Sequence, residues 1–126
     1  MSNPISEAVV KGTFGELLVQ LRLLQHGVQA AQPLKDSGND LIALRGEVVR
    51  TIQVKTTTND LPAWPEERKL YNLLAIVVLR GEGTEVFLDA SEIYLIPKQD
   101  LRKLPRRWEA LGQFRLSAEH VAALFA

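Results

Sequence analysis

A carboxylate, an amide and an ammonium group are predicted to gather at one end of a short β-hairpin. Two β-rich runs flank Gly46-Glu47, a pair that favours a type II′ turn. In the register that this turn sets, Asp40 lies opposite Gln53, and Lys55 follows two residues later on the same face. Such a cluster on a sheet costs desolvation energy unless its members pair with one another or bind a ligand.

Glu16 is a further candidate, on a predicted helix. It lies one turn beyond Gly12 and Thr13 and one turn before Gln20, so these residues share a face. Gly12 and Gly15 each cost about 1 kcal/mol in a helix interior relative to alanine. Small residues beside a carboxylate leave room for a metal or a phosphate. Alternatively, Glu16 is solvated and the glycines only allow close packing of the helix on a sheet.

The hairpin residues also have simpler interpretations. An aspartate after Gly-Asn is usually a turn residue. Asp40 and Lys55 would then form an ion pair on the sheet, with Gln53 bonded to a neighbour. This interpretation leaves the glycines beside Glu16 and the shared register unexplained.

Length and composition predict a single domain spanning residues 1–126. The chain is 46% apolar and 24% charged, as in ordinary globular domains. No apolar run approaches the roughly 18 residues that span a bilayer, and the first residues lack a signal-peptide pattern, so we expect no membrane partner and a cytoplasmic location. Cysteine is absent, and His26 and His120 lie far apart in sequence, which argues against a zinc enzyme.

The charge pattern permits nucleic-acid binding on a local surface only. The formal net charge is zero, whereas dedicated nucleic-acid binders are usually basic. Two segments are exceptions. One is a polar loop in which Trp64 stacks on a base beside Arg68 and Lys69, or else packs under its own loop. The other is a basic run that contains Lys98, Arg102, Lys103, Arg106 and Arg107 against Asp100.

The elements that must position these groups follow from hydrophobic periodicity. A long helix is expected from an N-cap at Ser6 to Gln25, with His26 at the favourable end of its dipole and Gly27 as its C′ residue. Strands and helices are then expected in this order: an extended segment at 28–33, the hairpin strands 41–44 and 48–54, a buried central strand at 73–79, a Gly81-Glu82-Gly83 turn, short strands at 85–88 and 93–96 ending at Pro97, a short helix broken by Pro105, and a final helix capped by Ser117 with Val121, Leu124 and Phe125 buried. In that last helix His120 is expected to be an ordinary helix-face residue. This is an α/β arrangement with one mixed sheet of about five strands flanked by helices.

These residues resemble the PD-(D/E)XK nuclease superfamily. Its signature is a glutamate on a helix, an aspartate at the start of a strand, and E-x-K or Q-x-K on the next strand. Here GTFGELLVQLRLLQHG carries Glu16, SGNDLIAL carries Asp40, and IQVKTT carries Gln53-Val54-Lys55. The likeness is greatest to Holliday-junction resolvases and small homing endonucleases, and it extends from about residue 7 to residue 57. It implies a restriction-endonuclease-like core.

The resemblance implies metal-dependent hydrolysis of DNA phosphodiester bonds. Mg²⁺, or Mn²⁺ in its place, would be held by Asp40, the side-chain oxygen of Gln53 and the backbone carbonyl of Val54. Glu16 would serve a second ion or hold a water. Lys55 would orient or deprotonate the attacking water, or stabilise charge on the phosphate. Glutamine in place of the usual acid predicts weaker metal binding.

Two other functions remain open, and the partners follow from each. A catalytically degenerate domain would bind nucleic acid or a protein without cleavage, and a small regulatory subunit would bind protein only. If the chain cuts both strands of DNA, a symmetric homodimer supplies two sites most simply. Its interface would be the C-terminal helix or an edge strand.

Overall fold

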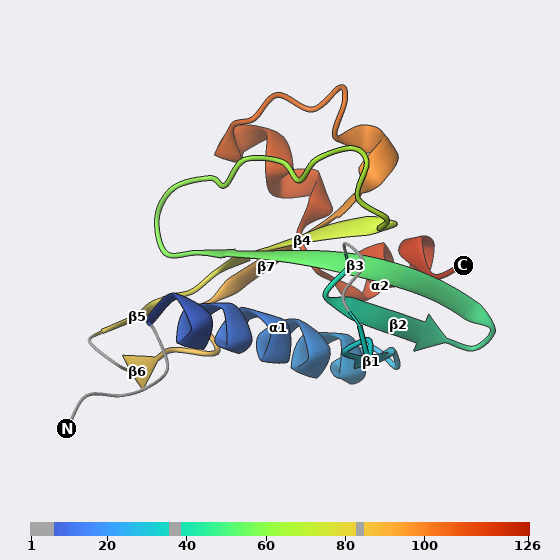
Figure 1. Ribbon diagram of the computed structural model, residues 1–126, viewed down its shortest axis with the longest axis horizontal. Helices are drawn as coiled ribbons and strands as arrows, with labels where there is room; N and C mark the ends of the chain where they lie inside the picture. Colours follow the sequence, from blue (N-terminus) through green and yellow to red (C-terminus); the bar gives the residue numbers. More distant parts are fainter. Residues whose placement is uncertain (1–6, 36–38, 83–84) are drawn as a thin grey trace.

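The computed structural model describes residues 7–35, 39–82 and 85–126 (Figure 1). In chain order its elements are α1 (Glu7–Gln25), β1 (Gln29–Ala31), β2 (Leu41–Arg45), β3 (Val48–Thr57), β4 (Leu73–Val78), β5 (Gly81–Glu82), β6 (Glu85–Val86), β7 (Glu92–Pro97), the 3-10 helices η1 (Lys98–Asp100) and η2 (Trp108–Phe114), and α2 (Ala118–Leu124).

One mixed sheet of five strands organises the fold, in the order β1-β2-β3-β4-β7. Strands β3 and β4 are parallel, and the other neighbouring pairs are antiparallel. The central strand β4 is buried at every residue, as expected of a strand covered on both faces. The predicted α/β class with about five strands and flanking helices is confirmed.

Each face of the sheet has its own apolar core. Below the sheet in Figure 1, α1 and α2 pack on Leu41, Ile52 and Val77, among others. Above it, the loop between β3 and β4 joins η2 over Leu74 and Ile76. Alternate residues of β3 and β4 therefore belong to different layers.

The helix α1 ends as the sequence predicts. Gly27 has φ 77°, its N–H donates to Leu24, and the N–H of Val28 donates to Leu23. This is the Schellman arrangement, in which a left-handed C′ residue satisfies the last helical carbonyls. The predicted N-cap Ser6 lies outside the described residues.

The hairpin has the predicted turn and register. Gly46 has φ 61° whereas no non-glycine residue described has a positive φ, which fits type II′ rather than type I′. The ladder pairs Arg45 with Val48 and continues to Leu41 opposite Ile52. It stops there, one residue before the predicted pair of Asp40 and Gln53.

The segment after β4 differs from the prediction. Residues 85–88 do not join the main sheet, because only Glu85 and Val86 are extended and they pair with β5. The edge of the main sheet is instead β1, within the extended segment predicted at 28–33. Gly81 and Glu82 are strand residues, and Gly83 of the predicted turn lies outside the described residues. After Pro97 the expected helix is one 3-10 turn.

The final helix is capped as predicted, but His120 does more than occupy its face. Ser117 Oγ accepts a hydrogen bond from the N–H of His120 at 3.1 Å. The ring nitrogen Nε2 of His120 lies 2.7 Å from the carbonyl of Leu95 on β7. His120 therefore connects α2 to β7 of the sheet through this contact. No helix in the described part of the chain is long and apolar enough to cross a membrane.

The outer face of α1 is apolar and uncovered. Val9, Leu17, Leu21 and Leu24 are 47–60% exposed, and their spacings of eight, four and three residues follow one side of the helix. By contrast, Val121 and Phe125 of the C-terminal segment are buried in the core. The predicted burial of Val121 and Phe125 is thus confirmed.

Candidate functional site

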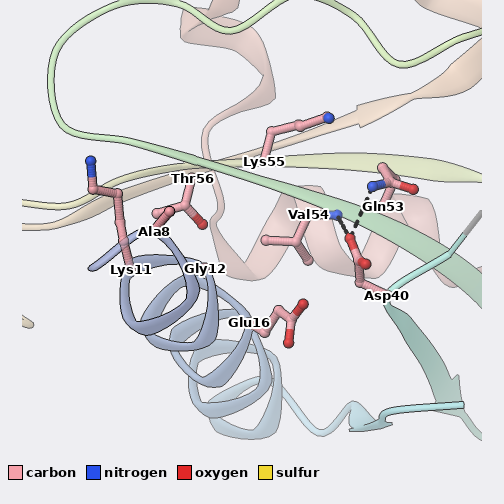
Figure 2. A pocket seen from close by; sticks show the side chains of 9 residues that line it. All are labelled: Ala8, Lys11, Gly12, Glu16, Asp40, Gln53, Val54, Lys55 and Thr56. Atoms are coloured by element: carbon pink, nitrogen blue, oxygen red, sulfur yellow. Dashed lines mark hydrogen bonds between the residues drawn. The ribbon is translucent and has the colours of Figure 1, made fainter. Parts of the chain in front are cut away.

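Asp40 occupies the point where β2 leaves β3. Its N–H donates to the carbonyl of Ile52 at 2.8 Å. Its Oδ2 accepts two hydrogen bonds, from the N–H of Val54 at 2.7 Å and from Nε2 of Gln53 at 3.0 Å (Figure 2). Asp40 and Gln53 therefore meet through their side chains, although the ladder pair between them does not form. The bond from Gln53 agrees with one part of the simpler interpretation, in which this amide binds a neighbour.

The edge of β3 beyond Ile52 is left uncovered by β2. The strand β2 pairs only with residues 48–52, whereas β3 continues to Thr57. In a strand, the N–H and C=O of one residue point to the same side. The N–H of Val54 points to Asp40, so the carbonyl of Val54 faces the same open edge.

Gln53 contributes an unusual oxygen. Its side chain is only 7% exposed, and Oε1 is a buried acceptor without a hydrogen-bond partner in the described structure. Buried polar atoms are nearly always paired, and an exception calls for an explanation such as an ion or a ligand.

Lys55 shares the face of Gln53. In the parallel ladder Gln53 and Lys55 pair with Leu74 and Ile76, which belong to the layer away from α1. Lys55 forms no hydrogen bond or ion pair with any residue that the structure describes.

Glu16 approaches from α1. Its Oε2 accepts a hydrogen bond from Nε2 of Gln32 at 3.0 Å, which ties the carboxylate to the segment after β1. Figure 2 shows the carboxylate directed toward the space between α1 and β3. Glu16 is half-buried, and its hydrogen bond to Gln32 lies at an exposed position.

The two glycines of α1 have different roles. A Cβ on Gly15 would overlap Oγ1 of Thr56, so Gly15 lets the helix pack closely on β3. A Cβ on Gly12 would meet nothing within 4 Å. Gly15 thus follows the packing alternative, and Gly12 leaves open space beside Glu16.

One pocket of about 390 Å³ unites these groups (Figure 2). It wraps around the open edge of β3, because residues of both sheet faces line it. Its lining consists of Ala8, Lys11, Gly12 and Glu16 from α1, Asp40, and Gln53, Val54, Lys55 and Thr56 from β3.

Lys11 is the residue that the sequence interpretation missed. It lies three residues after Ala8 and four before Gly15, on the side of α1 that meets β3. Helical spacing from the glycines was therefore sufficient to find it.

The predicted nucleic-acid residues lie apart from this pocket, since none of them lines it. Trp64 packs on the core above the sheet, so its packing alternative is confirmed. Arg68 and Arg102 form exposed ion pairs with Glu66 and Glu67. The remaining cations, Lys69, Lys103, Arg106 and Arg107, take part in none of the side-chain ion pairs found in the described residues.

A second cavity of about 520 Å³ lies beside the basic run. Lys98 Nζ donates to the carbonyl of Lys69 and lies 4.5 Å from the centre of the Tyr71 ring. Burial raises the pKa of the Tyr71 hydroxyl, and the charge of Glu67 raises it further.

The acidic groups of the site are few. No group of three or more histidine, cysteine, aspartate or glutamate side chains is placed to hold a metal within the described ranges. Of the described residues, Glu16 and Asp40 are the carboxylates that line the main pocket, and the neutral amide of Gln53 lines it with them.

The fold described above is similar to that of a solved structure. The bacterial homing endonuclease I-Ssp6803I has a similar fold, with a TM-score of 0.52 over 79% of this chain and 71% of that chain. The sequences are 18% identical, so the similarity is one of fold. No protein-family model and no curated protein sequence matches this chain.

Proposed function

We propose that this chain is a metal-dependent endonuclease of the PD-(D/E)XK type that hydrolyses phosphodiester bonds in DNA. One observation carries the proposal. Glu16, Asp40, Gln53 and Lys55, which the sequence places on a helix and two strands, all line one pocket. The similarity of fold to a homing endonuclease supports the same class of function.

The residues present suit a hard divalent cation. Mg²⁺ prefers a few protein oxygens and keeps several waters. Asp40 offers carboxylate oxygens, Gln53 offers a buried oxygen without a partner, and Val54 offers a carbonyl at an open strand edge. These three residues would hold Mg²⁺ or Mn²⁺, with Glu16 on the opposite wall for a second ion or a water.

Each residue then has a defined task. A bound divalent ion supplies Lewis-acid activation of the phosphate and makes water a stronger acid. Lys55, which forms no ion pair with a described residue, directs its ammonium to the phosphate oxygens and stabilises the charge that develops on them. Gln32 orients the Glu16 carboxylate through its hydrogen bond.

The alternative is a degenerate nuclease domain that binds nucleic acid or a protein partner without cutting. Gln53 favours it, because its Nε2 donates to Asp40 and leaves the pocket with two carboxylates. The presence of Asp40, Lys55 and Glu16 together in the pocket favours catalysis.

The test is cleavage of labelled duplex, single-stranded and four-way-junction DNA in Mg²⁺ or Mn²⁺. Asp40→Ala and Lys55→Ala are prepared in parallel, with Arg45→Ala at the far end of β2 as a control. We expect metal-dependent cutting by the wild type and the control, and none by the two site variants. Equal activity in all four proteins would exclude the proposed site, and no activity in the wild type would favour the binding module.

We also propose that the active form is a homodimer joined through the outer face of α1. Five turns of helix expose Val9, Leu17, Leu21 and Leu24 on one side. An apolar stripe on a helix normally faces a packing partner, and a two-fold antiparallel pair of helices matches such a stripe to itself.

Light scattering of the wild type, Leu17→Glu and Ile42→Glu tests the dimer. Ile42 lies on a separate exposed apolar patch of β2. We expect twice the chain mass for the wild type and Ile42→Glu, and the single-chain mass for Leu17→Glu. If only Ile42→Glu dissociated the dimer, the interface would lie on β2 and not on α1.

A further inference from the structure

Lys11 of α1 lies in the pocket wall and has no polar partner among the described residues. Its side chain is half-buried, and it forms no hydrogen bond or ion pair with any residue in the described ranges. Surface lysines usually project into solvent or pair with an acid. This one lines the same pocket as Asp40 and Lys55.

The pocket has two ends of opposite charge. Figure 2 shows Glu16 and Asp40 together at one end, whereas Lys11 lies at the other, beside Ala8 and Thr56. A divalent ion belongs at the carboxylate end. The end with Lys11 suits an anionic group of the same ligand that lies next to the group bound by the divalent ion.

Small side chains make room beside Lys11. Ala8 and Gly12 form the adjacent wall, and a Cβ on Gly12 would meet no atom within 4 Å. The helix backbone at Gly12 is therefore open on this side.

Lys11 also lines a third cavity of about 560 Å³, with Phe14, Asn59 and Arg80 among its walls. Lys11 lines both cavities, and the end of β3 and the residues after it line them in turn, with Thr56 in the first and Thr58 and Asn59 in the other. A ligand that occupies both is extended, as a polynucleotide strand is.

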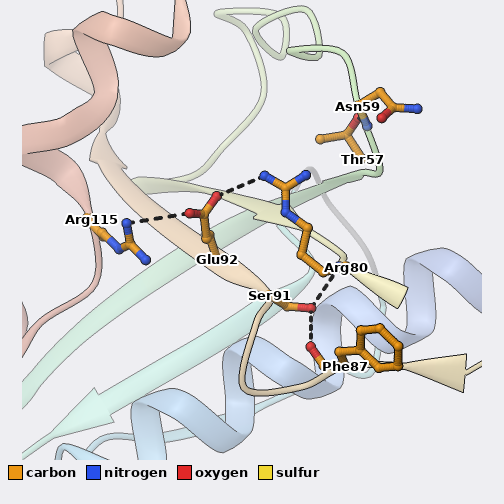
Figure 3. A network of polar contacts seen from close by, with 7 residues as sticks. All are labelled: Thr57, Asn59, Arg80, Phe87, Ser91, Glu92 and Arg115. Carbon is orange, nitrogen blue, oxygen red and sulfur yellow. Dashed lines mark hydrogen bonds and ion pairs between the residues drawn. The ribbon is translucent and has the colours of Figure 1, made fainter. Parts of the chain in front are cut away.

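The other cation of the third cavity, Arg80, already forms an ion pair. Arg80 lies 3.4 Å from Glu92, which also pairs with Arg115 at 3.5 Å (Figure 3). Glu7 and Glu85 line the same cavity and add negative charge. Among the described residues, Lys11 is therefore the cation of this cavity that takes part in no ion pair.

We infer that Lys11 binds a backbone phosphate of the DNA strand next to the phosphate that is cut. This inference rests on the proposed nuclease function and adds a substrate-binding residue to it. An ammonium group binds a phosphate as a point charge and displaces counterions from the DNA.

Salt-dependent binding without divalent metal tests the inference. The affinity of the DNA that the wild type cuts is measured in EDTA for the wild type, Lys11→Gln, Lys11→Arg and Arg45→Gln. Arg45→Gln removes one charge at the hairpin turn, about 17 Å along β2 from Asp40. We expect the slope of log affinity against log salt to fall by about 0.9 on duplex, or about 0.7 on single strands, in Lys11→Gln only. Unfolding curves that match the wild type establish that Lys11→Gln is folded.

Methylphosphonate substitution identifies the phosphate. Replacing a single phosphate near the cut by a neutral methylphosphonate is expected to weaken wild-type binding several-fold at the contacted position. The same substitution is expected to have no further effect on Lys11→Gln. If the two effects multiply at every position, or the salt slope is unchanged, Lys11 does not bind a phosphate. A wild type that neither binds nor cuts DNA would instead overturn the proposed function.

Discussion

Replacing Gln53 by glutamate places a second carboxylate against Asp40. In the wild type the Gln53 amide donates to Asp40 Oδ2 over 3.0 Å, within a side chain that is 7% exposed. Two unit charges 3 Å apart repel by about 5.5 kcal/mol at an effective dielectric constant of about 20. This repulsion would raise the pKa of one of the two carboxyl groups by roughly four units. We therefore expect the metal-free variant to keep one shared proton at neutral pH.

Metal binding must expel that proton. The Gln53→Glu variant should release about one proton for each Mn²⁺ bound at pH 7, and its affinity should rise about tenfold for each pH unit until the proton is lost. Above that pH the additional charge should make binding at least tenfold tighter than in the wild type. The wild type has no such proton to release from Gln53.

Calorimetric titration with Mn²⁺ between pH 6 and 8.5, in buffers of different ionisation enthalpy, measures both quantities. Gln53→Met is the control, because it removes the ligand oxygen without adding a charge, and it should bind more weakly than the wild type. Equal affinity and equal proton release in the wild type and Gln53→Glu would refute the charge argument. Without metal, the raised pKa of the shared carboxyl makes the variant lose stability as pH rises from about 4 toward 8.

Three smaller predictions concern the scaffold. Gly15→Ala should lower the free energy of unfolding by about 1–3 kcal/mol through overlap with β3, whereas Gly12→Ala should raise it by up to about 1 kcal/mol; equal effects in urea denaturation would contradict the two roles. Because burial raises the pKa of Tyr71, stability should fall as pH rises above about 10, and Tyr71→Phe should remove that fall in denaturation curves from pH 9 to 11. His120→Leu should cost about 1–2 kcal/mol by thermal unfolding, because a β7 carbonyl loses its partner; an unchanged stability would mean that this contact is not maintained.

Local patterns in the sequence predicted the parts of the fold that local physics determines. The C′ position of Gly27 requires a positive φ, and the Gly46 turn fixes the hairpin register. Both features depend on backbone conformations that few residues other than glycine adopt. The face shared by Gln53 and Lys55 then follows from the alternation of a strand.

Features that depend on tertiary contacts were harder to predict. Whether residues 85–88 reach the main sheet depends on the path of the chain after β4, which no local pattern specifies. The carbonyl that His120 meets belongs to β7, 25 residues away. Trp64 had two interpretations because its neighbours in space, the core above the sheet, are distant in sequence.

The candidate site depends on where β2 stops. Had its ladder with β3 continued past Ile52, β2 would cover the edge that carries the N–H and carbonyl of Val54. Asp40 instead turns its carboxylate onto that N–H, and α1 approaches the exposed edge closely because Gly15 has no side chain. The open edge therefore places a carboxylate, an amide oxygen and a backbone carbonyl beside one another, with Glu16 facing them. A register shift of two residues would keep the apolar pattern of both strands and yet remove this arrangement, so the hairpin turn is as important to the site as the residues that line it.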